Sequence, residues 1–358
     1  EDGRTCTLTL RRDALWSDGV PVTAQDFVYA WERLLAPESA SPYALDAALW
    51  IEGGEASLYG EEGAALGVRA LDDKTLEVRL TARCPYLDAL LARPDVDAVC
   101  IDTPTNMHKE VMIKAAKAGK HIYTEKVMCL NVADCDEVIR AVEENHVVFT
   151  ISLPQRTYPR NLFIKEAIDS GILGDITVLR CRNCHDGALA GWLPDYWYDP
   201  ETTGGGAMMD LGAHPMYLSA WMLGNPVRIQ SMFNNKTGHA VEDNSISTIE
   251  FENGAIAVSE TSLVSPMTPA IFEVYGTKGV ILAVDDDIKI KTVDTQKYLR
   301  DGWVVPRLPD PRPHPTRQGV DPCLYGKEIR YGVQEGRMLT ALMENAYIAD
   351  RERREVKF

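Results

Sequence analysis

Several common sequence features are scarce or missing in this chain of 358 residues. No apolar run approaches the roughly 18 residues of a membrane-spanning helix, and no stretch resembles a secretory signal peptide. Positive charge is also scarce, because 37 Lys and Arg face 53 Asp and Glu, giving a formal net charge of −16. We therefore expect a cytoplasmic protein that binds neither nucleic acid nor anionic membranes.

Cysteine is sparse too, with eight residues spread over a long chain, which excludes a disulfide-stabilised scaffold. One spacing still needs an explanation, because Cys181, Cys184 and His185 spell the C-x-x-C-H pattern of haem attachment. The segment 175–184 follows a turn and alternates like a strand, so residues three apart lie on opposite faces. We therefore expect a strand here, and neither haem nor a metal site.

A third absence is the G-x-G-x-x-G turn. In dinucleotide-binding sheets this turn joins the first strand to a helix whose N-terminus binds the pyrophosphate. The sequence contains no such turn, and therefore no acidic ribose-binding residue about 20 positions after one. The glycines of 53–63 do not follow a strand at the required spacing.

The first part of the chain combines short strands with helices. Residues 5–10 alternate like a strand, residues 16–19 predict a turn, and Thr23 is placed to cap a helix over 24–35. Apolar side chains at helical spacing are expected to face the core of this segment: Phe27, Trp31 and Leu34 or Leu35.

Further along this part, two short strands joined by an Asp-Asp-Lys turn at 72–74 predict a hairpin, and 85–92 begins with proline and predicts a helix. Together with the segment 10–44, these stretches resemble part of the substrate-binding proteins of oligopeptide ABC importers. The resemblance covers nearly all of 5–92 in register. In that family this piece is a fragment of a larger, two-lobed protein, so it implies no complete peptide site.

The next part alternates between apolar strands and helices. The expected order is a strand at 95–104, a helix ending at Gly119, a strand at 121–127, a helix at 131–146 and a strand at 147–153. This β-α-β-α-β order predicts a doubly wound parallel sheet, and hence an α/β fold. Ligands of such sheets bind at the carboxyl ends of the strands, which are occupied by Thr103, Asn106, His108, Glu125 and Lys126.

The stretch GGGAMMDLGAHP, residues 204–215, carries the most chemistry in the chain. Glycines allow another group to approach the backbone closely, and a helix is predicted to follow them. Asp210 and His214 are four residues apart, so both side chains lie on one face of that helix. A carboxylate beside an imidazole can transfer a proton to or from a bound substrate. Alone, the pair is also explained as a packing contact at a helix start.

Beyond residue 92, motifs occur in an order that resembles the Gfo/Idh/MocA family of nicotinamide-dependent oxidoreductases. They are DAVCIDTPTNMH, YTEKV, QRTYPRNLFIKEAIDSGILGDI, GGGAMMDLGAHPMYLSAWMLG, VEDNSISTIEFENGA and EVYGTKGV. The resemblance covers about residues 93–358. It implies that NAD or NADP exchanges hydride with a hydroxyl of a sugar or polyol-type substrate. It also implies a second α/β domain with a large open, mostly antiparallel sheet, through which the protein forms a homo-oligomer.

The resemblance also implies roles for single residues. Lys126 matches a lysine near nicotinamide and substrate, His214 matches the general base for the hydroxyl proton, and Asp210 would orient the substrate. The positions implied to line the cofactor are Thr103, Pro104, Asn106, His108 and Glu125. Val127 replaces the family's proline, which is expected to remove a rigid, often cis, bend.

Several of these candidate residues can also be explained by a purely structural role. Lys126 alone would be read as a surface lysine, and His108 as a helix-start residue. Arg156, beyond the third strand, is a weaker candidate for the site. Aromatic residues that could roof the substrate, or simply belong to the core, are Trp192, Trp197 and Tyr198.

We thus expect a chimera-like chain of three segments. Residues 1–92 are an importer-like fragment, 93–152 the second half of a dinucleotide-binding domain, and 153–358 a substrate and oligomerisation domain ending in a helix. Without its first half, the parallel sheet should keep an unpaired edge, and cofactor binding should be severely weakened. The alternatives are a non-catalytic binding or oligomer-forming module and, less in keeping with the fragment's size, peptide capture by residues 1–92.

Overall fold

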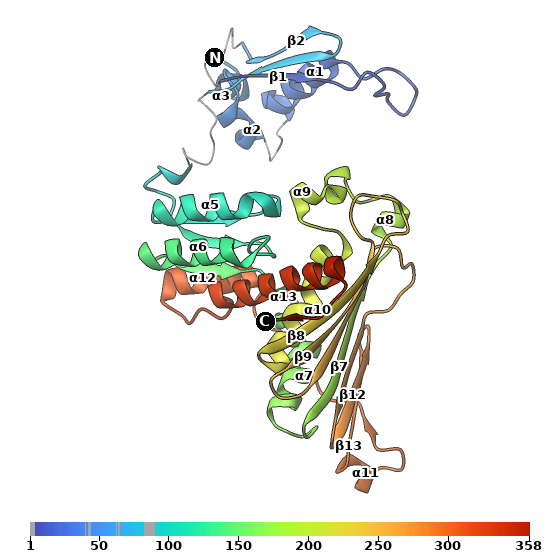
Figure 1. Ribbon diagram of the computed structural model, residues 1–358. Coiled ribbons are helices and arrows are strands. Elements are labelled where there is room, and N and C mark those ends of the chain that lie inside the picture. The colour runs from blue at the N-terminus through green and yellow to red at the C-terminus, as the bar shows by residue number, and fades with distance from the viewer. Residues whose placement is uncertain (1–3, 40, 42–43, 62, 64, 82–89) are drawn as a thin grey trace. The chain divides into compact units, whose positions relative to one another are not determined.

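The computed structural model describes residues 4–39, 41, 44–61, 63, 65–81 and 90–358. The chain forms two compact units, residues 1–93 and residues 94–358 (Figure 1). Among the described residues, no helix combines the length and the apolar composition that crossing a membrane requires.

The first unit is a small antiparallel sheet, in the order β1-β3-β2, packed against helices. Thr23 begins α1 as predicted, because its backbone N–H donates to the Asp26 carboxylate at 2.7 Å in a capping box. The elements are β1 (Thr5–Thr9), α1 (Ala24–Leu35), η1 (Pro37–Ser39), α2 (Ala44–Trp50), α3 (Gly54–Leu58), β2 (Val68–Asp72) and β3 (Thr75–Arg79). The predicted helix at 85–92 lies mostly outside the described residues.

The core of this unit differs from the prediction at one position. Trp31 and Leu35 pack inward, but Phe27 is 39 % exposed, and the prediction that it faces the core is wrong. The buried stripe of α1 instead begins with Ala24 and Val28, four residues apart. Apolar residues at helical spacing occur on two faces of α1, one with Phe27 and one with Ala24 and Val28. The face that is buried is the one that packs against β2 and β3.

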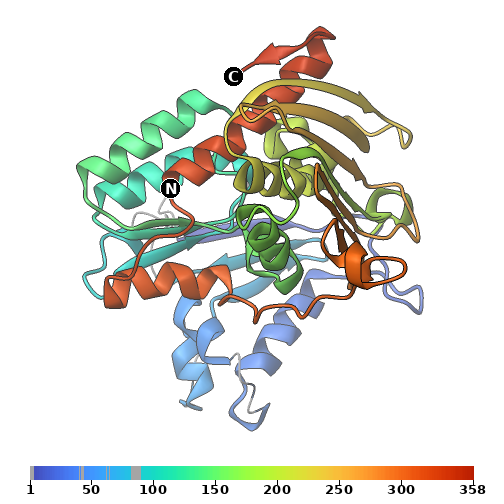
Figure 2. The ribbon, with the colours of Figure 1, turned by 90° about the horizontal axis from the view of Figure 1, so that it is seen from below.

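The second unit begins with the predicted parallel sheet, in the order β4-β5-β6. The helix that follows β4 lies against one face, and α12 (Pro315–Tyr325) contacts β5 and β6. In Figure 2 these strands lie between the α5 and α6 pair and α12. The elements are β4 (Ala98–Ile101), α5 (Thr105–Lys117), β5 (His121–Thr124), α6 (Val132–Glu144) and β6 (Phe149–Ile151).

Strand β4 is the edge of this sheet, because within the described part of residues 94–358 no strand pairs with it on the side away from β5. Ala98 and Cys100, on one face of β4, are exposed, whereas Val99 and Ile101 on the other face are buried. The edge that the sequence predicts is thus present in this unit.

A nine-stranded sheet forms the rest of the unit, in the order β14-β13-β12-β11-β7-β10-β9-β8-β15. Only the β7–β10 pair is parallel, so the prediction of a large, mostly antiparallel sheet is confirmed. The strands are β7 (Ile176–Cys184), β8 (Pro226–Asn234), β9 (Asn244–Phe251), β10 (Ile256–Ser262), β11 (Ile271–Gly276), β12 (Gly279–Val284), β13 (Asp287–Thr292), β14 (Trp303–Val304) and β15 (Val356–Lys357).

Two helices cover one face of this sheet, α10 (Ala213–Leu223) over β7 and β10 and α13 (Val333–Glu352) over β8. Helix α13 also packs on α6 and β6, so it joins the two sheets into one body (Figure 2). The opposite face of the large sheet presents exposed apolar residues, among them Met232, Ile246 and Ile256.

Short helices occupy the connections between these elements. They are η2 (Pro154–Thr157), α7 (Pro159–Asp169), α8 (Gly187–Ala190), η3 (Asp195–Tyr198), α9 (Pro200–Thr203), the π-helix η4 (Met208–Gly212) and α11 (Thr295–Tyr298). The segment from η3 to η4 contains the glycine-rich stretch. Residues of this segment and residues at the carboxyl ends of β4 and β5 line the same hollow.

Candidate active site

A hollow of about 270 Å³ lies where the carboxyl ends of β4 and β5 meet the segment from η3 to η4. This is the end of a parallel sheet at which ligands bind. Its lining residues come from both elements: Asp102, Thr103, Pro104, Thr105, His108, Glu125, Lys126, Val127, Tyr196, Trp197, Thr203, Gly205, Met209 and Asp210.

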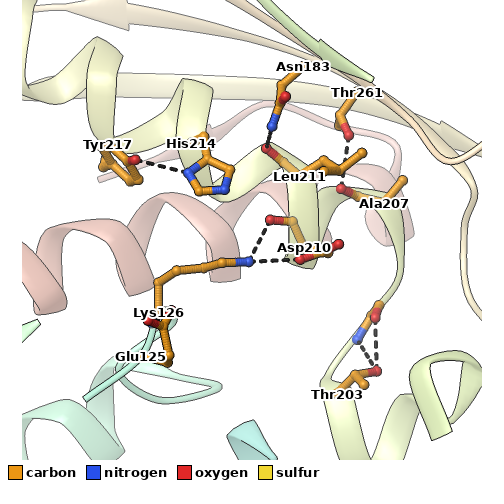
Figure 3. Close-up of polar contacts among 11 residues, drawn as sticks. Glu125, Lys126, Asn183, Thr203, Ala207, Asp210, Leu211, His214, Tyr217 and Thr261 are labelled. Carbon is orange, nitrogen blue, oxygen red and sulfur yellow. Dashed lines mark hydrogen bonds and ion pairs between the residues drawn. The ribbon is translucent and has the colours of Figure 1, made fainter. Parts of the chain in front are cut away.

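Lys126 and Asp210 form an ion pair on the wall of this hollow (Figure 3). The Lys126 ammonium donates to Asp210 Oδ1 at 2.9 Å and to the Asp210 backbone carbonyl at 2.7 Å. The two side chains are 14 % and 18 % exposed, so the pair is largely withdrawn from water. The surface-lysine alternative is therefore wrong for Lys126, whose ammonium has a fixed position facing the hollow.

Pro215 explains why the Asp210 carbonyl is free to accept this bond. Proline has no N–H, so it cannot donate to the carbonyls of Leu211 and Asp210, four and five residues before it. The Asn183 side-chain amide bonds the first carbonyl at 3.1 Å, and Lys126 bonds the second. The helix predicted after the glycines is present, but its first part, residues 208–212, is a π-helix, and α10 continues it from Ala213.

His214 begins α10 and is held by Tyr217, whose hydroxyl lies 2.9 Å from His214 Nδ1 (Figure 3). The Gln155 backbone N–H donates to the same hydroxyl at 3.0 Å. Burial, and then the nearby Lys126 charge, lower the pKa of His214 to about 3, with Asp210 opposing them. The imidazole is therefore neutral at pH 7. His214 is not among the residues that line the hollow, although it shares its helix face with Asp210.

The imidazole can exist in two neutral tautomers. When Nδ1 carries the hydrogen and donates to Tyr217, Nε2 has a lone pair and can accept a proton. When Tyr217 donates to Nδ1, Nε2 carries the hydrogen and can donate to a substrate oxygen. Among the described residues, Nε2 has no hydrogen-bond partner, so either reaction can take place there.

The three glycines before the helix are packed by the chain itself. A Cβ on Gly205 would lie 1.8 Å from the Tyr347 hydroxyl, and one on Gly206 would lie 2.0 Å from the Glu242 carbonyl. Gly205 does line the hollow, but the space that a side chain would need is filled by protein. The missing Cβ at these two positions therefore makes room for Tyr347 and for the Glu242 backbone, while Gly205 still borders the hollow.

Glu242 is a residue of this site that the sequence argument missed. Its buried carboxylate accepts hydrogen bonds from Gly206 N–H at 3.0 Å, Met208 N–H at 2.9 Å and the Tyr347 hydroxyl at 2.7 Å. Burial raises the pKa of Glu242, while the hydroxyl and backbone donors oppose that rise. The carboxylate thereby holds the start of the helix that carries Asp210. The VEDN motif contains this residue, but only the fold brings it to the glycines.

The residues predicted to line the cofactor are only partly gathered. Thr103, Pro104, His108 and Glu125 line the hollow, whereas Asn106 is exposed on the first turn of α5 and does not. His108 is buried, with ring nitrogens 2.8 Å from the Thr103 carbonyl and 2.9 Å from the Val127 carbonyl. His108 thus links the turns after β4 and β5. The alternative, in which it is only a residue at the start of a helix, does not account for these contacts.

The bend after Lys126 is present although proline is not. The Lys126–Val127 peptide bond is cis, so the expectation that Val127 removes the bend is wrong. Of the aromatic candidates, Trp197 lines the hollow together with Tyr196, which the sequence argument missed. Trp192 instead lies tilted against the His185 ring, and Tyr198 stacks on His239.

The C-x-x-C-H segment forms the predicted strand β7. Cys181 is buried, and Cys184 receives a hydrogen bond from Arg182 at 3.3 Å. His185 follows the strand and accepts the Gly187 backbone N–H at 3.0 Å. In the described part of the chain, no three His, Cys, Asp or Glu side chains are grouped so that they could hold a metal ion.

The lining of the hollow offers different groups to the nicotinamide and to the pyrophosphate of a dinucleotide. The Thr103 hydroxyl is buried without a partner, so it offers an unused hydrogen bond there. The lining carries the carboxylates of Asp102, Glu125 and Asp210 against the single ammonium of Lys126. A pyrophosphate is bound well by amide donors at a helix N-terminus. The start of α5 lines the hollow at Pro104 and Thr105, but the described residues before β4 in this unit contain no further strand, turn and helix of that kind.

Comparisons with known proteins match two different families to two parts of the chain. The family described as "GFO/IDH/MocA C-terminal domain" matches residues 162–282, and "Bacterial extracellular solute-binding proteins, family 5 Middle" matches residues 1–119. The periplasmic oligopeptide-binding protein OppA of Escherichia coli is 48 % identical over 101 residues, 28 % of this chain and 19 % of that protein.

Two further proteins resemble the larger part. The myo-inositol 2-dehydrogenase of Thermotoga maritima is 30 % identical over 217 residues, 57 % of this chain and 60 % of that enzyme. The structure of GenD2 from gentamicin A biosynthesis, in complex with NAD, superposes with a TM-score of 0.65 at 25 % identity, over 77 % of this chain and 83 % of that one.

The chain spans about three fifths of the curated dehydrogenase and about a fifth of the oligopeptide-binding protein. Both predicted resemblances are thus confirmed, as is the α/β fold class. The chain is chimera-like: it resembles the Gfo/Idh/MocA oxidoreductases over residues 93–358 and the substrate-binding proteins of oligopeptide importers over residues 1–92.

Proposed function

We propose that this chain is an NAD(P)-type oxidoreductase that exchanges hydride between nicotinamide and a hydroxyl of a sugar or polyol-type substrate. The observation that carries the proposal is the Lys126–Asp210 ion pair at 2.9 Å on the wall of the hollow. The names of the matched myo-inositol dehydrogenase and of the NAD complex of GenD2 support the substrate class and the cofactor. Bound nicotinamide would supply the hydride acceptor.

His214, Lys126 and Asp210 have distinct roles in the proposed reaction. His214 accepts the hydroxyl proton at Nε2 while Tyr217 holds its Nδ1. The lowered pKa keeps the imidazole neutral and able to accept, but it makes His214 a weak base until substrate and cofactor change its surroundings. Lys126 stabilises the negative charge that develops on the substrate oxygen. Asp210 holds the Lys126 ammonium in place and offers its second carboxylate oxygen to a neighbouring hydroxyl of the substrate. Thr103, Pro104, His108 and Glu125 are the proposed cofactor contacts, with Asn106 at their margin.

We further propose that dinucleotide binding is impaired. The sequence has no G-x-G-x-x-G turn, and the lining of the hollow has more carboxylates than ammonium groups, which disfavours a pyrophosphate. Titration of the full chain with NADH and with NADPH, followed by nicotinamide fluorescence, tests this. We expect millimolar or weaker dissociation constants for both. Micromolar binding of either would contradict the impairment and would also identify the preferred nucleotide.

Turnover tests the chemical role separately. The full chain is incubated with a panel of sugars and polyols and with NAD in the millimolar range, and NADH formation is followed. We expect slow turnover that falls about a hundredfold in the H214Q and K126M variants. Turnover that is unchanged in both variants would exclude these residues from the reaction.

A second candidate function is assembly. The uncovered face of the large sheet exposes Met232 at 76 %, Ile246 at 52 % and Ile256 at 44 %, and apolar patches of this kind mark interaction surfaces. We propose that the chain forms a homo-oligomer through this face. Light scattering of wild type and an I246D/I256D variant tests it. An oligomer that becomes a monomer in the variant supports the proposal, and a wild-type monomer contradicts it.

We place the proposed reaction in the cytoplasm, where cells keep their nicotinamide pools. This proposal has a simple test in the source cells. Fractionation followed by immunodetection of the chain should recover it with cytoplasmic markers. Recovery in a periplasmic fraction would contradict this location and would favour the role of the importer-like segment.

A further inference from the structure

A second hollow, of about 240 Å³, lies between η2, α10 and the start of α13. It shares no lining residue with the candidate active site. Its charged and polar lining residues are Arg156, Asn225, Gln334 and Glu335, and its apolar ones include Leu153 and Met338.

Arg156 is the unusual group in this hollow. It is only 9 % exposed, and its guanidinium carbon lies 4.9 Å from the centre of the Trp221 ring and 4.8 Å from that of Tyr331. Both rings are thus close enough to the guanidinium for cation–π interactions. The hydrogen-bond donors of a guanidinium lie in its plane, at the edge that stacked rings leave uncovered.

One donor at this edge is unused, because Arg156 Nε is buried and has no acceptor. Among the described residues, Glu335 acts on the guanidinium through its charge and not through a hydrogen bond. Burial lowers the pKa of Arg156, in keeping with a charge that has lost water without gaining a partner. A buried charge with unmade hydrogen bonds is costly, so an oxyanion that binds it recovers a large interaction.

Two charged neighbours act on Arg156 from the elements around it, Glu335 on α13 and Arg312 in the segment before α12. Glu335 lines the hollow but does not neutralise the guanidinium. One of its oxygens accepts the Gly332 N–H at 3.0 Å, in the capping box that begins α13. The positive end of this 20-residue helix therefore also faces the hollow, through Gln334 and Glu335 in its first turn.

The shape and the lining decide which anion fits. The hollow is smaller than the roughly 300–1,000 Å³ of pockets for drug-sized ligands, so its ligand is small. A planar carboxylate pairs side by side with the edge of a guanidinium. Leu153 and Met338 offer apolar contacts that inorganic phosphate cannot use, and Asn225 can bond a second polar group of an organic molecule.

We propose that this hollow is a binding site for a small organic carboxylate, which pairs with the edge of the Arg156 guanidinium between Trp221 and Tyr331. The ligand lies against Tyr217, which also lines the hollow and whose hydroxyl holds His214. The site is separate from the proposed reaction, and its existence does not depend on cofactor binding or turnover.

An NMR titration of the full chain tests the proposal. The indole N–H signal of Trp221, identified by its loss in W221F, is followed while butyrate is added. Inorganic phosphate and chloride at the same ionic strength serve as comparison anions. We expect a saturable shift with butyrate and at least a roughly tenfold weaker response to phosphate and to chloride. Equal responses to the three anions, or none to butyrate, would overturn the proposal.

Three variants locate the site. R156Q removes the cation and should weaken butyrate binding at least about tenfold. E335Q removes a repelling charge but keeps the helix cap, because glutamine serves in a capping box as well, so binding should be equal or tighter. If R156Q does not fold, R156K keeps the charge without the planar fork and should still weaken binding severalfold. Unchanged binding in a folded Arg156 variant would contradict the assignment.

Discussion

The two halves of the candidate active site differ in how completely their polar groups are satisfied. On the side of Lys126 and Asp210, each charged group has a partner, and Pro215, Asn183 and Tyr217 hold the surrounding helix. On the nucleotide side, the Thr103 hydroxyl has none, and β4 is an edge strand of its unit.

The difference follows from where the supporting contacts come from. The acid–base side is held by elements far along the chain, such as Glu242 before β9 and Tyr347 on α13, all within residues 94–358. The nucleotide side would be completed by a strand and a glycine turn before β4, where this chain carries the importer-like segment instead. The contacts that hold Lys126 and Asp210 therefore do not depend on the segment before β4.

The largest expected effect concerns the glycines on the acid–base side. In G206A the new Cβ meets the Glu242 carbonyl, which is 2.0 Å from its ideal position, and neither backbone segment can move freely. We expect a loss of about 3 kcal/mol in the free energy of unfolding, measured with urea. G332A is the matched control, because its Cβ would lie 3.4 Å from the Ile329 side chain, and it should cost far less. Equal costs would show that the loop is not packed as described.

Removal of the ammonium should come next. K126M leaves the Asp210 carboxylate, 18 % exposed, without its partner, and we expect a loss of about 2 kcal/mol in stability. The double variant K126M/D210L removes both charges and should recover part of that loss. If K126M changes the unfolding free energy by less than about 0.5 kcal/mol, the pair contributes no more than an ordinary surface salt bridge.

The pH dependence of stability should report His214. Its folded pKa is lowered to about 3 from an ordinary value of 6.5, so the unfolded chain binds a proton that the folded chain does not. This contribution is fully present above pH 6.5 and is lost as the pH falls toward 3. Between pH 6.5 and 5 the loss amounts to at most about 2 kcal/mol. Urea unfolding of wild type and H214Q at several pH values measures it, and parallel curves for the two proteins would contradict the shift.

The smallest effect is expected on the nucleotide side. T103V removes a buried hydroxyl that has no partner, so the unfolding free energy should change by less than about 0.5 kcal/mol. A cofactor contact at this hydroxyl predicts that NADH binding nevertheless weakens severalfold, as measured by fluorescence. A large loss of stability would mean that the hydroxyl is bonded within the protein.

Much of this arrangement follows from sequence pattern, because strand and helix periodicity and the order of motifs are local properties. The strands β4, β5 and β6 and the capped helix α1 are of this kind. Lys126 and Asp210 are assigned to one site only through the family resemblance, and their ion pair joins residues 84 positions apart. Phe27 could not be placed, since two stripes of α1 are apolar and only β2 and β3 select between them. The contacts of Glu242 and Tyr347 join residues 105 positions apart, which no local pattern reveals.

The spacing of Asp210 and His214 places the two residues near each other, but it does not predict that Asp210 lies in a π-helix. Pro215 lies five residues after Asp210, and the sequence contained the signal for a distorted turn. Arg156 was considered for the active site, yet Trp221 and Tyr331 hold it at a different hollow. The position of the Arg156 side chain depends on Trp221 of α10 and on Tyr331 in the segment before α13, which are distant in sequence.

We propose that the acid–base groups are intact, whereas binding of the dinucleotide is impaired. The most direct measurement is the initial rate of NADH formation from a polyol as NAD is raised into the millimolar range, for wild type and K126M. We predict a wild-type rate that rises linearly with NAD without saturation and falls about a hundredfold in K126M. Saturation at micromolar NAD, or a K126M rate equal to wild type, would contradict the account.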